Sequence, residues 1–132
     1  MLLDGTIDEA QYRSAFATME RDRVDALFVS GENPWGYNQL IVALAAKSRI
    51  PAIYQFREIV ALGGLMANAF DLADSWRKLA DVTVQILKGA NPGDIPIDQA
   101  TKYELVINVK AAKALGLEIP PSLLLRADEV FE

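Results

Sequence analysis

The sequence of 132 residues contains no cysteine and no histidine. The first absence excludes disulfides, thiolate nucleophiles and zinc sites with sulfur ligands, although it leaves the cellular compartment open. The second excludes Ser-His-Asp and Cys-His catalytic arrangements and every metal site that depends on imidazole. Only Asp, Glu, Lys, Tyr and Ser remain for acid, base or nucleophile chemistry. The sequence therefore indicates neither a metal site nor a cofactor, and it favours binding over catalysis.

Basic charge and long apolar runs are also scarce. The 13 Lys and Arg residues, against 18 Asp and Glu, leave a net charge of −5 and form no stripe that could neutralise a phosphate backbone. Nucleic acid is therefore not an expected partner. The longest apolar run, residues 40–46, is far shorter than the roughly 20 residues of a membrane span. Residues 1–4 lack the basic region of a signal peptide, so we expect a soluble chain without a targeting signal of its own.

The rest of the composition, 52% apolar and 23% charged, is that of an ordinary globular domain with a real core. The first part of the chain alternates helical patterns with continuous apolar runs, which are typical of parallel strands covered on both faces. This order predicts an α/β fold with right-handed crossovers. The predicted elements are a helix over 6–22 with a Thr6/Glu9 capping box, a strand over 25–30, a helix over 34–48 capped by Asn33, and a strand over 49–54.

Residues 51–65 look like the crossing point between this first part and a second one, with Gly63 and Gly64 serving the backbone geometry of the break. Beyond it, the apolar stripe through Trp76 predicts a helix with its stripe in the core. The predicted elements are a strand over 65–69, a helix begun by Asp71 and ended by Gly89, extended segments over 97–100 and 104–108, a helix over 109–115 ended by Gly116, and last helical turns over 120–127.

The order of several short motifs resembles one family along nearly the whole chain. The resemblance is dense from residue 51 to 132 and looser, though collinear, from 7 to 49. The motifs are Pro-Ala-Ile-Tyr at 51–54, Gly-Gly-Leu-Met at 63–66, Ile-Leu-Lys-Gly-Ala at 86–90, Glu-Leu-Val-Ile-Asn at 104–108, Ala-Lys-Ala-Leu-Gly-Leu at 112–117 and Ile-Pro-Pro-Ser-Leu-Leu at 119–124. The family that they resemble is that of the bacterial ABC-transporter substrate-binding proteins of the tryptophan/tyrosine-binding type.

This resemblance implies a partial type I periplasmic binding protein fold, in which two Rossmann-like parallel sheets flanked by helices form lobes that close on a ligand. Family members are roughly twice this length, so the chain looks like the C-terminal part only. The resemblance assigns residues 1–56 to the second lobe, 57–96 to the first lobe, and 97–132 to a hinge return and C-terminal segment. Hinge crossings are expected at Phe56–Arg57 and at Ile97–Thr101.

The resemblance also implies partners and a location. The partners are a small-molecule solute and, in the intact system, an ABC permease, and the full-length form is expected to be periplasmic or otherwise extracytoplasmic. The chain alone would leave an apolar sheet face and a sheet edge uncovered. We therefore expect it to form a homo-oligomer or to exchange segments with a neighbour, because exposed edges and large apolar patches seldom stay bare.

Candidate ligand-binding residues lie where the predicted strands end, since ligands of open parallel sheets bind beyond the carboxyl ends of the strands. In the first loop, Glu32 and Asn33 can bond a polar group of a ligand, and Trp35 offers a flat apolar face. The alternative interpretation of the same residues is structural. In it, Asn33 caps the following helix, Pro34 starts that helix and Trp35 merely packs.

The second loop adds two rings and a cation. Tyr54 and Phe56 can stack on a ring of the ligand, and the two-pronged guanidinium of Arg57 can pair with a carboxylate. In the alternative interpretation, Arg57 and Glu58 form a solvated pair that opens a helix, and Tyr54 belongs to the core.

The third loop contributes Asn68 and Phe70, because Asp71 is better explained as a helix cap. Two other functions stay open at this point. Glu32 and Glu58 could face one cleft and act as the carboxylate pair of an enzyme. An intracellular ligand-sensing or dimerising module is the second alternative, since this fold class also occurs in regulators.

Overall fold

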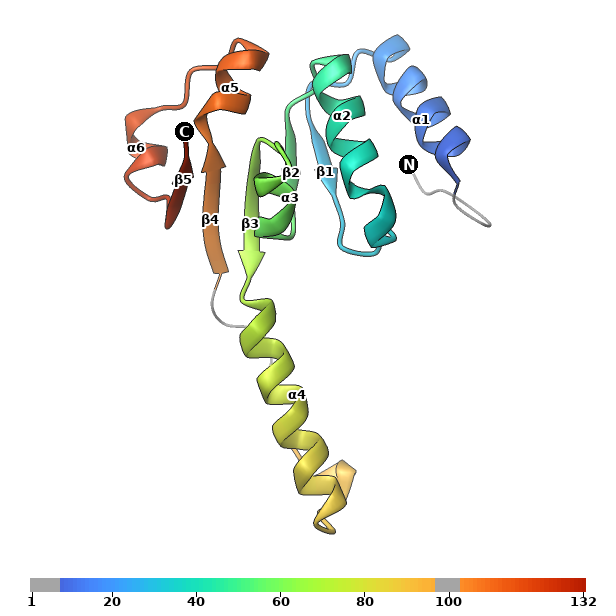
Figure 1. The fold of residues 1–132 in the computed structure, drawn as a ribbon, viewed down its shortest axis with the longest axis vertical. Coiled ribbons are helices and arrows are strands. Elements are labelled where there is room, and N and C mark those ends of the chain that lie inside the picture. The colour runs from blue at the N-terminus through green and yellow to red at the C-terminus, as the bar shows by residue number, and fades with distance from the viewer. Residues whose placement is uncertain (1–7, 97–102) are drawn as a thin grey trace.

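The computed structural model describes residues 8–96 and 103–132 (Figure 1). Its centre is a five-stranded sheet in the order β1-β2-β3-β4-β5, so the predicted α/β class is confirmed. The strands are β1 Leu27–Val29, β2 Ala52–Tyr54, β3 Met66–Phe70, β4 Tyr103–Asn108 and β5 Glu129–Phe131. The helices are α1 Glu9–Arg21, α2 Asn38–Ser48, α3 Arg57–Ala61, α4 Leu72–Leu87, α5 Val109–Leu115 and α6 Pro121–Leu124, with 3-10 turns η1 Trp35–Tyr37 and η2 Pro92–Asp94.

The sheet is mixed, so the predicted parallel pattern holds only in part. β1, β2 and β3 run parallel, and so do β4 and β5, but β3 and β4 are antiparallel. The reversal arises because the chain leaves the sheet after Phe70 and re-enters it at Tyr103, which is the residue paired with Phe70. A chain that departs and returns at the same edge must run back in the opposite direction.

Helix α4 projects away from the sheet and the helices packed on it, here called the sheet body (Figure 1). Asp71 caps the helix as predicted, accepting a hydrogen bond from the Asp74 amide at 2.9 Å, and Gly89 follows its end with a positive φ of 100°. None of the residues of α4 is buried, and Trp76 is 62% exposed. The prediction that the Trp76 stripe belongs to the core is therefore wrong within the described residues.

The path of the chain bears on the expected division into lobes, which itself stays a prediction. Residues 57–70 belong to the sheet body, because α3 buries Ile59 and Val60 and β3 lies between β2 and β4. The chain leaves the body after Phe70 and not at Phe56–Arg57. The other expected crossing, residues 97–101, lies outside the described residues, together with the extended segment predicted over 97–100.

The strand register separates the two faces of the sheet. Tyr54 lies on the face against which α2 and α5 pack. On the opposite face, the residues of one row across the sheet are Phe28, Ile53, Met66, Ile107 and Val130. Phe28 is 59% exposed and Val130 is 41% exposed, so this second face is partly open, as expected from the sequence.

Some local predictions fail. Asp8 and Gln11 form the capping box of α1, whereas the predicted Thr6 lies outside the described residues. The helix predicted over 34–48 is divided into η1 and α2, and the Asn33 side chain caps neither. Strand β5 was not predicted, and its three residues pair with β4 next to the last helical turns.

Candidate functional site

Three aromatic rings meet at the edge of the sheet where β1, β2 and β3 end. The ring centroids of Trp35 and Phe56 are 4.9 Å apart, and those of Phe56 and Phe70 are 5.4 Å apart in an edge-to-face arrangement. These three residues are called the aromatic cluster below. Trp35 is 53% exposed, while Phe56 and Phe70 are half-buried. The cluster therefore offers solvent an apolar surface of fixed rings, a geometry suited to stacking against another ring.

The loop after β1 is tied to this cluster. The Gly31 amide donates a hydrogen bond to Gln55 Oε1 at 2.5 Å, which links the loops that follow β1 and β2. A Cβ atom at position 31 would lie 2.8 Å from the Phe56 ring, so only glycine allows this approach. The Glu32 side chain is exposed beside this contact.

The Asn33 side chain holds the loop from within. Its Nδ2 donates to the Ser30 carbonyl at 2.7 Å, and its Oδ1 accepts a hydrogen bond from the Tyr12 hydroxyl at 3.0 Å. These bonds orient the segment that carries Trp35. They also use the two polar atoms of the Asn33 side chain that the sequence suggested for a ligand, so Asn33 chiefly positions the loop.

Arg57 lies at the same edge but points to other partners. Its guanidinium pairs with Glu104 at 3.4 Å and forms a second ion pair with Glu129. It therefore joins the start of α3 to the first residues of β4 and β5, and not to Glu58 as the structural alternative predicted. With two carboxylates already beside it, Arg57 is a brace of the sheet edge.

Asn68 and Phe70 lie on one face of β3, since they are two residues apart on a strand. Asn68 is exposed and its amide can reach a ligand placed over that face. Sequence reasoning missed Tyr103, which is paired with Phe70 in the sheet and is 58% exposed. A signal existed in the sequence, namely an aromatic residue at the start of a strand, but its position beside Phe70 depends on the antiparallel return.

Tyr54 lies apart from the aromatic cluster. It is 1% exposed and its ring packs on the helix-covered face of the sheet. Burial raises the pKa of its phenol to about 12. Tyr54 is therefore a core residue, as the structural interpretation of the sequence had it. The aromatic cluster consists of Trp35, Phe56 and Phe70.

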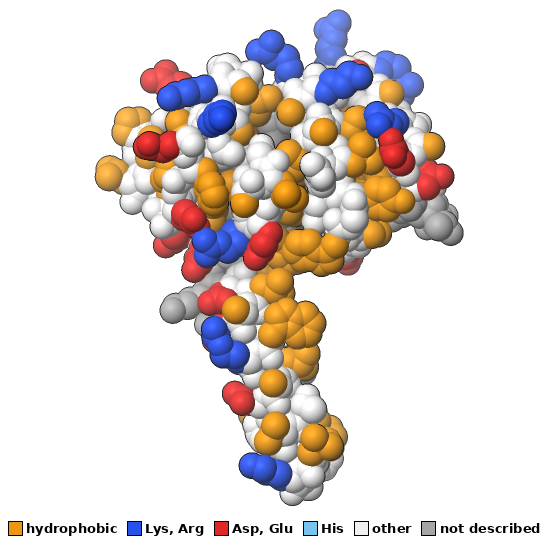
Figure 2. All heavy atoms as spheres, viewed as in Figure 1, with side chains coloured by type: hydrophobic (Ala, Val, Ile, Leu, Met, Phe, Trp, Pro, Cys, Tyr) orange, Lys and Arg blue, Asp and Glu red, His pale blue; other side chains and the backbone are white. Residues whose placement is uncertain are grey.

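The apolar surface continues from the sheet body onto α4. Figure 2 shows hydrophobic side chains gathered at the lower edge of the body and along one side of the projecting helix. The exposed apolar residues of α4 include Trp76, Leu79, Val84, Ile86 and Leu87. An exposed apolar patch of this kind usually binds a ligand or packs against another part of a protein.

In the parts of the chain that the structure describes, 8–96 and 103–132, no group of three or more Asp and Glu residues is placed to hold a metal ion. Within the same ranges, every helix is too short or too polar to cross a lipid bilayer.

Comparison with known proteins gives the family context. A model of the family described as ABC transporter substrate binding protein matches residues 8–131. The tyrosine-binding protein of Clostridioides difficile (strain R20291) is 28% identical over 97 residues, which are 73% of this chain and 28% of that protein.

Two solved structures share the fold closely. The ABC domain in complex with L-Trp from Streptococcus pneumonia is 30% identical, with a TM-score of 0.83 over 94% of this chain. A conserved domain protein from Vibrio cholerae O1 biovar eltor is 26% identical, with a TM-score of 0.84 over 93% of this chain. In both cases the chain spans 42% of the length of its relative.

Proposed function

Because the chain belongs to the ABC transporter substrate-binding protein family, we propose that it forms most of the second lobe of a solute receptor. The receptor captures a small organic molecule such as an amino acid and delivers it to an ABC permease. The observation that carries this proposal is the aromatic cluster of Trp35, Phe56 and Phe70 at the carboxyl ends of three neighbouring parallel strands. Ligands of open α/β sheets bind at this edge.

The solute would lie in a cleft between this lobe and a first lobe supplied by a longer polypeptide. The rings of the aromatic cluster would stack on the solute, while Glu32 and Asn68 would bond its polar groups. Tyr103 extends the same aromatic edge. Binding energy would come from ring stacking, and specificity from the penalty for leaving directed polar groups unpaired.

The position of α4 supports the same arrangement. The helix leaves the sheet body beside the aromatic cluster and carries an uncovered apolar stripe, which suits a segment that packs on another lobe. The relatives named above are more than twice as long as the chain, so they contain room for that lobe. Delivery of a solute to a permease would place the intact receptor outside the cytoplasm.

We propose no catalytic role. The family is one of binding proteins, and the two carboxylates that an enzyme would use, those of Glu32 and Glu58, are both exposed. A solute bound on exposed rings, without desolvated acid and base groups, is held and released unchanged.

A thermal-shift screen of the intact receptor against amino acids, aromatic acids and short organic acids tests this proposal. We expect at least one amino acid to raise the melting temperature and to bind with submillimolar affinity in calorimetric titration. Replacing Trp35 with alanine should weaken that binding by about tenfold or more, as for a ring at the centre of a contact. The control is Phe28→Ala, which removes a similarly exposed ring from β1 outside the cluster.

If no compound in the screen shifts the melting temperature, the receptor function fails. If a solute binds but Trp35→Ala and Phe28→Ala weaken it equally, the function stands and the aromatic cluster is not its site.

A further inference from the structure

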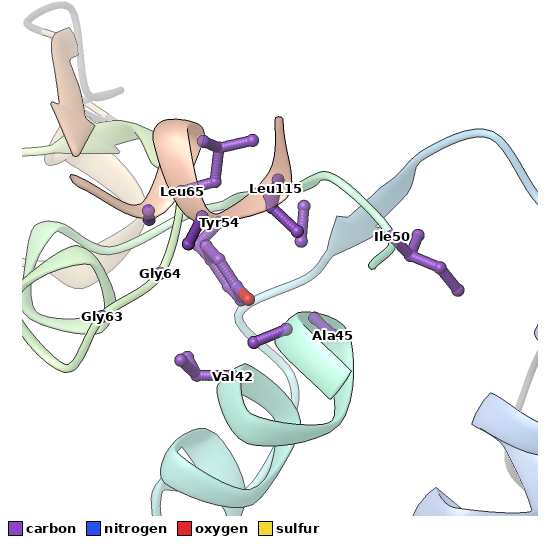
Figure 3. Close-up of a pocket in the computed structure, with 12 residues that line it drawn as sticks. Val42, Ala45, Ile50, Tyr54, Gly63, Gly64, Leu65 and Leu115 are labelled. Atoms are coloured by element: carbon purple, nitrogen blue, oxygen red, sulfur yellow. The ribbon is translucent and has the colours of Figure 1, made fainter. Parts of the chain in front are cut away.

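A small pocket lies on the helix-covered face of the sheet, between α2 and α5 (Figure 3). It has a volume of about 130 Å³ and is lined by apolar side chains and by the Gly63–Leu65 turn. The small side chains of alanines on the two helices, among them Ala45, Ala46 and Ala114, leave this space unfilled. This opening is called the Tyr54 pocket below.

Among the described residues that line it, the one polar side-chain group is the hydroxyl of Tyr54, which Figure 3 shows projecting among the lining residues. Tyr54 is 1% exposed, and its hydroxyl makes no hydrogen bond to another described residue. Because burial raises the pKa of this phenol to about 12, the group is protonated at neutral pH and can both donate and accept. Since no fully buried side-chain oxygen among the described residues lacks a partner, this hydroxyl touches solvent at the pocket, and a ligand there would take the place of water.

The pocket is open to solvent on one side, since its lining residues Ala46, Gly63 and Ala114 are exposed. Among the described side chains that line it, water finds one hydrogen-bonding partner, the Tyr54 hydroxyl, and otherwise meets apolar surface. Dry apolar cavities of about 150 Å³ are able to bind a benzene-sized molecule. The Tyr54 pocket therefore matches a small ring better than it matches solvent.

Charge selects further among ligands. None of the described residues that line the pocket is Asp, Glu, Lys or Arg. The Arg49 guanidinium, 3.7 Å from where a Cβ on Gly116 would lie, is near the end of α5 but is not part of the lining. A charged ligand would lose its hydration without gaining a counter-ion, so the pocket suits neutral molecules.

The Tyr54 pocket also differs in place from the proposed solute site. Ile50 precedes β2, Leu65 precedes β3 and Ala111 follows the antiparallel β4, so these lining residues lie near the ends of the sheet where β2 and β3 begin. The aromatic cluster lies where those strands end.

We propose that the Tyr54 pocket is a second binding site, for a small neutral molecule that consists of one ring or short apolar body with a single hydrogen-bonding group. The apolar part fills the space between α2 and α5, and its polar atom bonds the Tyr54 hydroxyl. Phenol has this size and chemistry and serves as the probe.

The test is a titration of the intact protein with phenol, followed by ligand-observed NMR and calorimetry. Saturable binding with a dissociation constant of roughly 1 mM or lower is expected for so small a ligand. Ala46→Leu fills the pocket from its rim and should weaken binding by about tenfold or more, because the added side chain occupies the ligand's place. Ala43→Leu is the matched control, an exposed alanine of the same helix outside the lining, and should leave phenol binding unchanged.

Two further variants test the hydrogen bond to Tyr54 and the α5 side of the pocket. Tyr54→Phe should weaken phenol binding by about two- to tenfold and leave benzene binding unchanged, because only phenol bonds the hydroxyl. Ala114→Leu fills the pocket from α5 and repeats the test if Ala46→Leu impairs folding.

The proposal is overturned if phenol does not saturate, or if folded variants with leucine at position 46 or 114 bind phenol as the wild type does. Displacement of phenol by the amino acid that the receptor binds would show a shared site and also overturn it. Failure of the amino-acid screen leaves this test intact, because phenol binding is measured without that solute.

Discussion

The sharpest prediction about stability concerns the substitution Gly64→Ala. A Cβ atom at this position would lie 2.7 Å from Tyr54 Cε2 and 2.8 Å from the Ile59 carbonyl oxygen. Carbon atoms do not approach so closely, and neither neighbour can move freely, since one is backbone and the other is a ring that is 1% exposed. Overpacking of this kind costs about 1–3 kcal/mol. Gly64→Ala should therefore lower the free energy of unfolding by that amount, or the melting temperature by roughly 4 °C per kcal/mol.

Its neighbour Gly63 should respond for a different reason. Gly63 has a φ of 105°, but the nearest atom to an added Cβ is 3.8 Å away. Gly63→Ala should cost about 1–2 kcal/mol through backbone strain alone. The control, Gly36→Ala, meets nothing within 4 Å and should change stability by less than about 0.5 kcal/mol.

Urea unfolding of the three variants, with NMR of the Tyr54 ring, separates these causes. Gly64→Ala should shift the Tyr54 ring resonances and Gly63→Ala should not. If Gly64→Ala unfolds at the same urea concentration as Gly36→Ala, the contact geometry of this turn is wrong.

Three more predictions concern other parts of the chain. Burial raises the pKa of Tyr54 from 10.0 to about 12, so the folded state holds the phenol proton more tightly than the unfolded state does. The stability that this difference contributes is complete below pH 10 and is lost as the pH rises towards 12. About 2–3 kcal/mol of the free energy of unfolding should therefore disappear over that window in the wild type but not in Tyr54→Phe. Asp71→Ala removes the cap of α4, worth about 1 kcal/mol, and should speed amide exchange at Asp74 about fivefold in hydrogen-exchange NMR, whereas an unchanged rate would show that the cap contributes nothing. The isolated chain should self-associate through α4, and Trp76→Lys should shift its sedimentation towards the monomer; a wild type that is already monomeric at high concentration would contradict this.

Many of the helices and strands could be predicted from the sequence because their signals are local. Apolar runs identified β1 and β2, Asp71 and Gly89 bounded α4, and Gly116 ended α5 with a φ of 76°. Each of these features depends on a few adjacent residues and on the backbone geometry that they favour.

The failures depend on contacts between distant residues. The antiparallel direction of β4 follows from where the chain returns after α4, which no local pattern records. The Trp76 stripe has the periodicity of a core helix, yet periodicity does not say which surface covers it. Arg57 pairs with Glu104 on β4 and Glu129 on β5, two partners far from it in sequence that no local pattern indicates.

The candidate site was predictable in part, because some of its residues are marked by local signals. Trp35, Phe56 and Phe70 each follow a predicted strand, and parallel strands bring their carboxyl ends to one edge. Tyr54 immediately ends its strand and faces the helices, so its proximity in sequence to Phe56 was misleading.

A crystal structure of the intact receptor with the amino acid that gives the largest thermal shift is the most direct test of the proposed solute site. We expect the side chain of the bound amino acid to contact Trp35, Phe56 or Phe70 at about 4 Å, the distance of van der Waals contact. A ligand bound elsewhere, with the three rings still facing solvent, would contradict the assignment of the aromatic cluster.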